Sequence, residues 1–308
     1  MRKLAHITSI SVIIFMLIGI HPLHAQYIIE QIEYEIPVSY ELIPEDIEFE
    51  NPEDEAMFFL NLPENDLKKS AIAEGRELQI EKSTIYLDGE NIAVENDSEE
   101  MRKTTMISNS STGKIYSVLW SQKKVIEFSQ EEMNKMQEKS QAFADEMLKN
   151  LTPEMRKQIE EEMQKESKKV PVKYTAESTG KKSKKYGFDC EQYIVNKDEE
   201  IISIWATSDN LGISKEVRRL TEKFNEIFKS DDGEDIDEWE LVAGKIPVEI
   251  RTFSSSMMHE PILVIQAITK IENKKPSPGI FKVPDEKDGF SKGSMMDMMN
   301  QMMPENND

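Results

Sequence analysis

Cys190 and His259 are the two side chains of this sequence that could form a nucleophile and its base. Because the other three histidines lie within residues 1–25, His259 is the only histidine beyond that segment. Cys190 lies in an alternating apolar pattern, which is typical of a strand in which a free cysteine packs. No serine lies in a nucleophile elbow, so a Ser-His-Asp triad is not expected. We therefore predict a protein that is not an enzyme and has no catalytic residue.

A metal site would need ligands that this composition scarcely supplies. One cysteine and one histidine would leave carboxylates to complete a zinc shell. The acids at 45–55 and 231–238 could hold calcium, but neither run has the spacing and the glycine of a calcium-binding loop. Solvated charge is the simpler interpretation, and we expect no metal site and no cofactor.

Methionine is frequent, with 18 in the chain. Met257 and Met258 precede His259, and further methionines crowd the C-terminal tail. Thioethers are soft ligands that suit Cu(I), so copper handling is one hypothesis. The other interpretations are an adaptable apolar stripe that grips a partner or a lipid, and a flexible tail over 291–308. The tail methionines are Met295, Met296, Met298, Met299, Met302 and Met303.

Lysines cluster between Lys165 and Lys185, where the acids Glu166 and Glu177 are few against them. A basic patch on an acidic protein could touch anionic head groups or an acidic partner. The alternative is a solvated helix end followed by the tip of a hairpin.

The charge of the whole chain excludes one class of partner. Its 308 residues include 38 Lys and Arg against 59 Asp and Glu, which gives a net charge of −21. Binding to phosphate backbones needs a basic surface, so we expect no nucleic-acid partner. The hydrophobic fraction of 38% is low for a globular protein, but a chain of this length can still bury a core.

The N-terminus has the pattern of a Sec-type signal peptide over 1–25. Arg2 and Lys3 precede an apolar run at 10–20, and Ala25 stands where cleavage is expected. The run is short for a membrane span of about 20 residues, and no cysteine follows it to carry a lipid anchor. We expect a periplasmic or secreted protein with no transmembrane segment after cleavage, and one without an internal disulfide.

Hydrophobic periodicity divides the remainder into strands and helices. Pro44, Pro52 and Pro63 lie among many acids at 41–66, which predicts a long acidic loop or insertion, with the apolar residues at 57–60 packed on the body. The expected helices cover 129–149 and 153–168, which together would form a lid over 129–168, and a third helix begins at Ser214. The expected strands cover 27–40, 78–87, 115–120, 125–128, 170–176, 188–196, 201–207, 245–253, 261–271 and 279–284, with Asp88-Gly89 as a hairpin turn.

The central strands resemble a known family. The residues that carry the resemblance are Tyr186-Gly187-Phe188-Asp189-Cys190-Glu191-Gln192-Tyr193-Ile194-Val195, Ile204-Trp205-Ala206-Thr207, Leu211-Gly212-Ile213, the strand at 264–270 and Phe281-Lys282-Val283-Pro284. This pattern is similar to domain of unknown function 4412, a family of secreted bacterial proteins related in fold to the LolA/LolB lipoprotein carriers. The similarity covers about 170–290, while the acidic insertion and the methionine tail depart from it.

The resemblance implies an α+β fold in which a curved antiparallel half-barrel sheet is covered by helices, as a single LolA-like domain over 26–290. Such a layout can leave an apolar cavity between the sheet and its lid, and the order of predicted elements agrees with it. The predicted lining of this cavity consists of Trp120, Met133, Met136, Phe143, Met147, Trp205, Phe224 and Phe228.

Three functions follow in order of preference. The first is a non-enzymatic periplasmic protein that binds a hydrophobic ligand, such as an acyl chain or a lipoprotein anchor, in that cavity. The second is a structural or interaction module of the envelope that binds another envelope protein and no small ligand. The third is Cu(I) handling through methionine.

Overall fold

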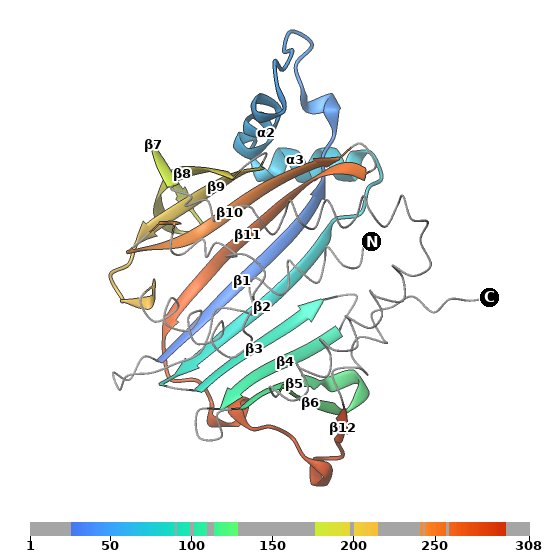
Figure 1. The fold of residues 1–308 in the computed structure, drawn as a ribbon, viewed down its shortest axis with the longest axis vertical. Coiled ribbons are helices and arrows are strands. Elements are labelled where there is room, and N and C mark those ends of the chain that lie inside the picture. The colour runs from blue at the N-terminus through green and yellow to red at the C-terminus, as the bar shows by residue number, and fades with distance from the viewer. Residues whose placement is uncertain are drawn as a thin grey trace, which may run out of the picture.

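The computed structural model describes residues 26–89, 91–98, 102–109, 114–128, 176–197, 200–214, 241–242, 244–256 and 259–293. These residues form one large sheet with two α-helices at one end (Figure 1). The strands are β1 (Gln26–Pro37), β2 (Gln79–Asp88), β3 (Asn91–Ser98), β4 (Arg102–Asn109), β5 (Lys114–Leu119), β6 (Lys124–Phe128), β7 (Ala176–Lys185), β8 (Phe188–Lys197), β9 (Glu200–Ser208), β10 (Lys245–Ser256), β11 (His259–Asn273) and β12 (Ser291–Gly293). The helices are η1 (Tyr40–Leu42), α2 (Pro52–Asn61), α3 (Glu64–Ala73), η2 (Trp120–Gln122), η3 (Pro278–Phe281) and η4 (Glu286–Asp288).

The sheet has the strand order β12-β6-β5-β4-β3-β2-β1-β11-β10-β9-β8-β7. Strands β2 to β6 form one antiparallel meander, and β7 to β11 form a second. The N-terminal strand β1 lies between the two meanders, because it pairs with β2 on one side and with β11 on the other. Within this sheet, the pairing of β12 with β6 is parallel and every other pairing is antiparallel.

This architecture corrects the predicted fold class. An α+β half-barrel covered by helices is wrong, because the twelve strands form an open sheet that ends at β12 and β7. In the described part of the chain, the α-helices are α2 and α3, each of ten residues. The physical reason is that β1 joins the two meanders into one continuous ladder, which adds strands side by side. The predicted lid at 129–168 and the predicted helix from Ser214 onward lie almost entirely outside the described residues.

Apolar residues at alternate positions build the central part of the sheet. Ile29 of β1 lies opposite Ile85 of β2, which lies opposite Val94 of β3. All three are buried in one cluster, which Tyr27, Leu87 and Ile268 also join. Paired β-branched and aromatic side chains on one face stabilise adjacent strands. The strands predicted over 78–128 are therefore largely confirmed, and Asp88-Gly89 forms the β2–β3 turn with Gly89 at φ +62°.

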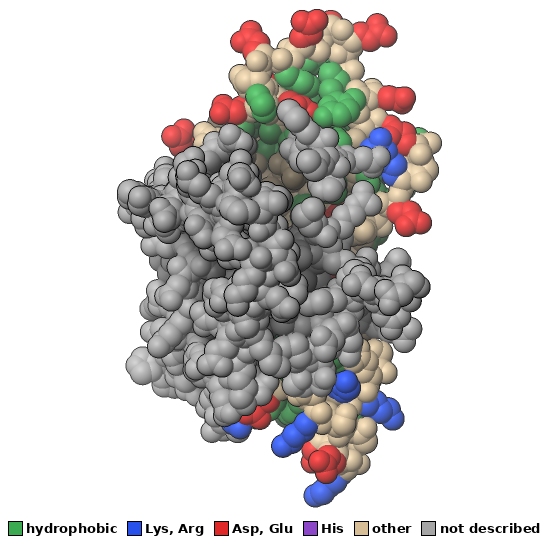
Figure 2. All heavy atoms as spheres, turned by 45° about the vertical axis from the view of Figure 1, so that its right-hand side comes forward, with side chains coloured by type: hydrophobic (Ala, Val, Ile, Leu, Met, Phe, Trp, Pro, Cys, Tyr) green, Lys and Arg blue, Asp and Glu red, His purple; other side chains and the backbone are tan. Residues whose placement is uncertain are grey.

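The acidic segment is a helical element rather than a loop. Asn51 caps α2, because its side-chain oxygen accepts a hydrogen bond of 2.8 Å from the Asp54 amide. Pro52 then begins the helix, where its missing N–H costs nothing, and acids in the first turn suit the helix dipole. Most acidic side chains of 41–66 project to solvent at this end of the molecule (Figure 2).

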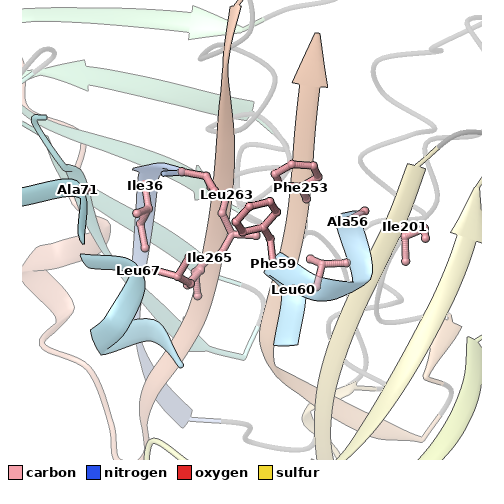
Figure 3. Packing of buried hydrophobic residues seen from close by; sticks show 11 residues of the cluster. Ile36, Ala56, Phe59, Leu60, Leu67, Ala71, Ile201, Phe253, Leu263 and Ile265 are labelled. Atoms are coloured by element: carbon pink, nitrogen blue, oxygen red, sulfur yellow. The ribbon is translucent and has the colours of Figure 1, made fainter. Parts of the chain in front are cut away.

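Phe59 and Leu60 of α2 confirm that the apolar residues of this segment pack on the body. Both are fully buried, and Phe59 stacks on Phe253 of β10 with ring centroids 5.1 Å apart. Figure 3 shows them on α2, among residues of α3 and of the strands β1, β9, β10 and β11. The residues of this cluster are Ile36, Val38, Ala56, Phe59, Leu60, Leu67, Ala71, Ile201, Phe253, Leu263 and Ile265.

The strand predicted at 279–284 is wrong. Residues Pro278–Phe281 form the 3-10 helix η3, in which Pro278 occupies the first turn. Proline has no amide donor for a strand ladder, and its fixed φ suits a helical start. Phe281 is nevertheless buried, in a cluster with Ala93, Ile107 and Val118 of the sheet.

Candidate functional site

A pocket of about 460 Å³ lies between the sheet and the segment that joins α2 to α3. We call this segment, Leu60 to Glu64, the linker. The sheet side of the pocket comes from β7, β9 and β10 and from the β7–β8 turn. The lining residues are Leu60, Asn61, Leu62, Pro63, Glu64, Ser183, Lys184, Lys185, Tyr186, Trp205, Glu249 and Arg251. A volume of this size is in the usual range for sites that hold small molecules.

Strand register explains why polar side chains meet beneath the linker. Glu249 of β10 lies opposite Trp205 of β9, which lies opposite Gln192 of β8. Arg251 is two residues beyond Glu249 and therefore on the same face of β10, opposite Ser203. The register thus gathers these five side chains on one face of the sheet.

Glu249 and Arg251 form a buried ion pair at the floor of this pocket. Their side chains are 1% and 3% exposed, and the Arg251 Nε donates to Glu249 Oε1 over 2.7 Å. Lys185 donates to the same oxygen over 2.8 Å, and its ammonium lies 4.8 Å from the centre of the Trp205 ring. Buried charges of this kind persist only where partners and hydrogen bonds compensate them.

Arg251 also fastens the linker to the sheet. Its Nη1 donates to the carbonyl oxygens of Leu60 and Leu62, over 3.1 Å and 2.6 Å. These carbonyls lie at the C-terminal end of α2, where the helix itself provides no donor. Gln192 adds a further bond, because its side-chain amide donates to Asn61 Oδ1 over 3.1 Å. The position of the linker therefore depends on side chains that the sheet presents.

Glu64 and Tyr186 form a second polar contact in the lining of the pocket. The Tyr186 hydroxyl donates to Glu64 over 2.7 Å, and Lys68 donates to the other oxygen of Glu64. Burial alone would raise the pKa of Glu64, but the hydrogen bonds from Lys68 and Tyr186 outweigh it and lower the pKa. Burial and the Glu64 carboxylate both raise the pKa of Tyr186. Tyr186 has a left-handed backbone with φ +48°, a conformation that is rare for an aromatic residue.

A second pocket, of about 540 Å³, lies along β7, β8 and β9. Glu191 lies in it, and hydrogen bonds from Ser178, Lys245 and Tyr193 lower its pKa to about 2. Cys190 also lines this pocket, but its side chain is buried, and desolvation raises the pKa of its thiol to about 11. A protonated thiol is a weak nucleophile. The prediction that Cys190 packs in a strand is therefore confirmed.

One more buried carboxyl lies in the middle of the sheet. Glu33 of β1 is almost fully buried, and the Gln266 side-chain amide of β11 donates to it over 2.9 Å. Desolvation raises the pKa of Glu33 to about 7; the Gln266 hydrogen bond opposes this effect, and the nearby Glu81 and Glu35 add to it. This carboxyl lines neither of the two pockets.

Of the predicted cavity residues, the structure describes Trp120 and Trp205, and it does not bring these two together. Trp205 lines the linker pocket, whereas Trp120 lies on η2, at the end of β5. Trp120 is 38% exposed, its indole N–H donates to Thr105 over 2.7 Å, and its ring packs edge-on against Phe290. It therefore does not line the pocket that contains Trp205. Met133, Met136, Phe143, Met147, Phe224 and Phe228 lie outside the described residues.

Sequence reasoning missed the charged residues of the pocket. Glu249 and Arg251 were visible only as two charges in the apolar pattern of the predicted strand at 245–253. Their spacing of two residues could have indicated a shared face and therefore a buried pair. Lys185 was assigned either to a basic patch for an anionic partner or to the solvated tip of a hairpin, and Glu64 to a loop.

Two further properties of the described residues concern membranes and metals. None of the helices in the described ranges is long and apolar enough to cross a membrane. Among the residues with described positions, no three His, Cys, Asp or Glu side chains are grouped so that they could hold a metal ion.

Comparisons with known proteins leave the chain without an assigned family. No family model matches it, and no curated protein matches it. Among solved structures, a match was found to PNGF-II in the P21 space group, with 8% sequence identity and a TM-score of 0.22. That match covers 90% of this chain and 33% of that chain, so this chain spans about a third of its length. A TM-score this low carries no argument about fold or activity.

Proposed function

We propose that the protein is a non-enzymatic, exported binding protein that holds a small ligand with an apolar body in the linker pocket. The observation that carries this proposal is a cavity of about 460 Å³ whose lining includes the apolar residues Leu62, Pro63 and Trp205. The export component rests on the signal-peptide pattern over 1–25. An acyl chain of moderate length remains the model ligand, and the resemblance to domain of unknown function 4412 remains a prediction.

The lining of this pocket is more polar than that of the apolar cavity that the sequence predicted. Its lining mixes apolar residues with Lys185, Glu249 and Arg251, so a purely hydrocarbon ligand would leave charged groups facing it. A ligand with one apolar and one polar end suits this mixed lining. We therefore restrict the proposed ligand to small amphiphiles.

A blocked pocket gives a direct test. Isothermal titration calorimetry should detect one site for at least one member of a C8 series, namely octanoate, 1-octanol and octylammonium. Ser183→Trp places a large ring at the pocket lining, and Glu177→Trp places the same ring on an exposed part of the same strand, away from that lining. Loss of binding in S183W but not in E177W would support the proposal. Failure of all three probes to bind the unmodified protein would refute it.

Exposed lysines favour a second function, an interaction module of the envelope. Lys181, Lys182 and Lys184 are exposed on β7, the strand at one end of the sheet. A row of cations on an acidic protein suits an acidic partner. Crosslinking that recovers one stoichiometric protein partner, which Lys→Glu changes at these positions abolish, would support this function. The copper hypothesis rests on Met257, Met258 and the tail methionines, which lie outside the described residues.

A further inference from the structure

We propose that the ligand of the linker pocket carries a carboxylate, and that this head group binds between the Lys185 ammonium and the Arg251 guanidinium. This inference rests on the proposed function and adds the chemical class of the ligand. It is carried by the excess of cations in the pocket lining and by hydrogen-bond donors of Arg251 and Lys185 that have no protein partner.

The lining of the pocket holds more positive than negative charge. Its cations are Lys185, Arg251 and the exposed Lys184, and its carboxylates are Glu64 and Glu249. The ion pair with Lys68, which stands outside the lining, further compensates Glu64. An excess cation in a partly dry site attracts an anion far more strongly than it would in water. The surplus stands out because the whole chain has a net charge of −21.

Some hydrogen-bond donors of Arg251 have no protein partner in the pocket. A guanidinium has five N–H groups, of which the Nε donates to Glu249 and the Nη1 donates to Leu60 and Leu62. Within the described structure, the Nη2 of Arg251 has no hydrogen-bond partner, although the residue is 3% exposed and lines the cavity. Because the Nη2 is not fully buried, a ligand oxygen in the cavity can reach it and accept a hydrogen bond from it in place of water.

Lys185 supplies the second donor beside it. Its ammonium makes one hydrogen bond, to the Glu249 oxygen that Arg251 also contacts. Both cations are therefore held around a single carboxylate oxygen, with the remaining ammonium protons of Lys185 available. A ligand carboxylate has two oxygens and can accept from both residues at once, which is the strong, charge-assisted mode of binding.

Glu249 contributes to the selectivity of the site for a carboxylate head group. Its buried carboxylate fixes Lys185 and Arg251 by contacts with both. Its negative charge also opposes a ligand carboxylate in part, and the excess of cations in the lining outweighs this repulsion. A neutral alcohol would accept hydrogen bonds from fewer of these donors, and the excess positive charge would repel an ammonium. The expected order of affinity is carboxylate, then alcohol, then ammonium.

The same C8 series tests the inference, with calorimetry at fixed ionic strength. Octanoate should bind the unmodified protein on the order of tenfold or more tightly than 1-octanol, because each charge-assisted hydrogen bond is worth about that factor. Lys185→Met should reduce the octanoate preference to about a few-fold. The control Lys182→Met changes a lysine of the same strand that does not line this pocket, and it should retain the preference.

Glu249→Gln distinguishes the proposal from structural damage, because the proposal predicts a higher affinity for octanoate whereas damage would lower it. It removes a negative charge but keeps an oxygen acceptor, so octanoate should bind more tightly than it does to the unmodified protein. Thermal unfolding of each variant checks that it is folded. Equal affinity for octanoate and octanol, or weaker octanoate binding by folded E249Q, would overturn the carboxylate inference. Absence of binding by all three probes would instead overturn the proposed function itself.

Discussion

Arg251→Met should destabilise the fold, because it removes the hydrogen bonds that hold the linker against the sheet. The guanidinium makes a contact with Glu249 at 2.7 Å and two hydrogen bonds to linker carbonyls. Breaking a buried pair by removing one partner costs about 3–5 kcal/mol, because the other charge stays buried. Lys185 still compensates Glu249 in this variant, so we expect a loss of about 3 kcal/mol in the free energy of unfolding.

Urea unfolding followed by far-UV circular dichroism measures this loss. Lys270→Met is the matched control, because Lys270 also pairs with carboxylates on the sheet, at Glu30 and Glu272, but is 48% exposed. An exposed pair contributes about 0–1 kcal/mol, so the control should change stability by no more than that. Both variants should show the m-value of the unmodified protein.

A double variant separates the ion pair from general damage. Changing both Glu249→Leu and Arg251→Met removes both charges, so it should cost at least about 1 kcal/mol less than the sum of the two single changes. Strict additivity, or a loss below about 1 kcal/mol for Arg251→Met alone, would refute the reasoning. Either result would mean that the buried pair does not hold the linker.

Three further predictions concern other parts of the structure. Phe59→Ala should cost about 3–5 kcal/mol in urea unfolding, because it leaves a cavity against Phe253, and a loss below about 1 kcal/mol would contradict this packing. Because burial raises the pKa of Glu33 from 4.5 to about 7, the folded protein binds this proton more tightly than the unfolded chain does. Its contribution to stability should therefore fall by about 3 kcal/mol as pH rises from about 4.5 to above 7, and Glu33→Gln should abolish that part of the pH dependence; identical profiles would count against the raised pKa. The buried Cys190 thiol, with a pKa of about 11, should react with iodoacetamide at pH 8 about a hundredfold more slowly in the folded protein than in urea, and equal rates would contradict its burial.

Local periodicity predicted most strands of both meanders because these strands carry their own alternating apolar residues. Ile85 and Leu87 of β2 and Ile202 and Ile204 of β9 are examples of such pairs, and all four are buried. It missed β7, Ala176–Lys185, whose polar sequence was interpreted as a turn after a strand at 170–176. The pairing of β1 with β11 could not be predicted in the same way. It joins residues more than 200 positions apart, such as Ile36 and Leu263, and no local pattern encodes such a contact. That pairing determines the open twelve-stranded sheet.

The two helices and the pocket were missed for different reasons. The prolines and acids of 41–66 were interpreted as loop residues, although Asn51 and Pro52 are also a helix start. The pocket depends on three segments that the chain brings together only in the fold: the linker, the end of β7 at Lys185, and β10 at Glu249 and Arg251. Trp205 was predicted to line a cavity, and it does line this pocket, but its charged neighbours were not foreseen.

A crystal structure of the protein with octanoate tests the central claim most directly. We predict that the carboxylate lies within hydrogen-bond distance of the Lys185 Nζ and the Arg251 Nη2, with its hydrocarbon chain against Leu62 and Pro63. Octanoate bound elsewhere, or bound in this pocket with its carboxylate turned away from both cations, would contradict the account.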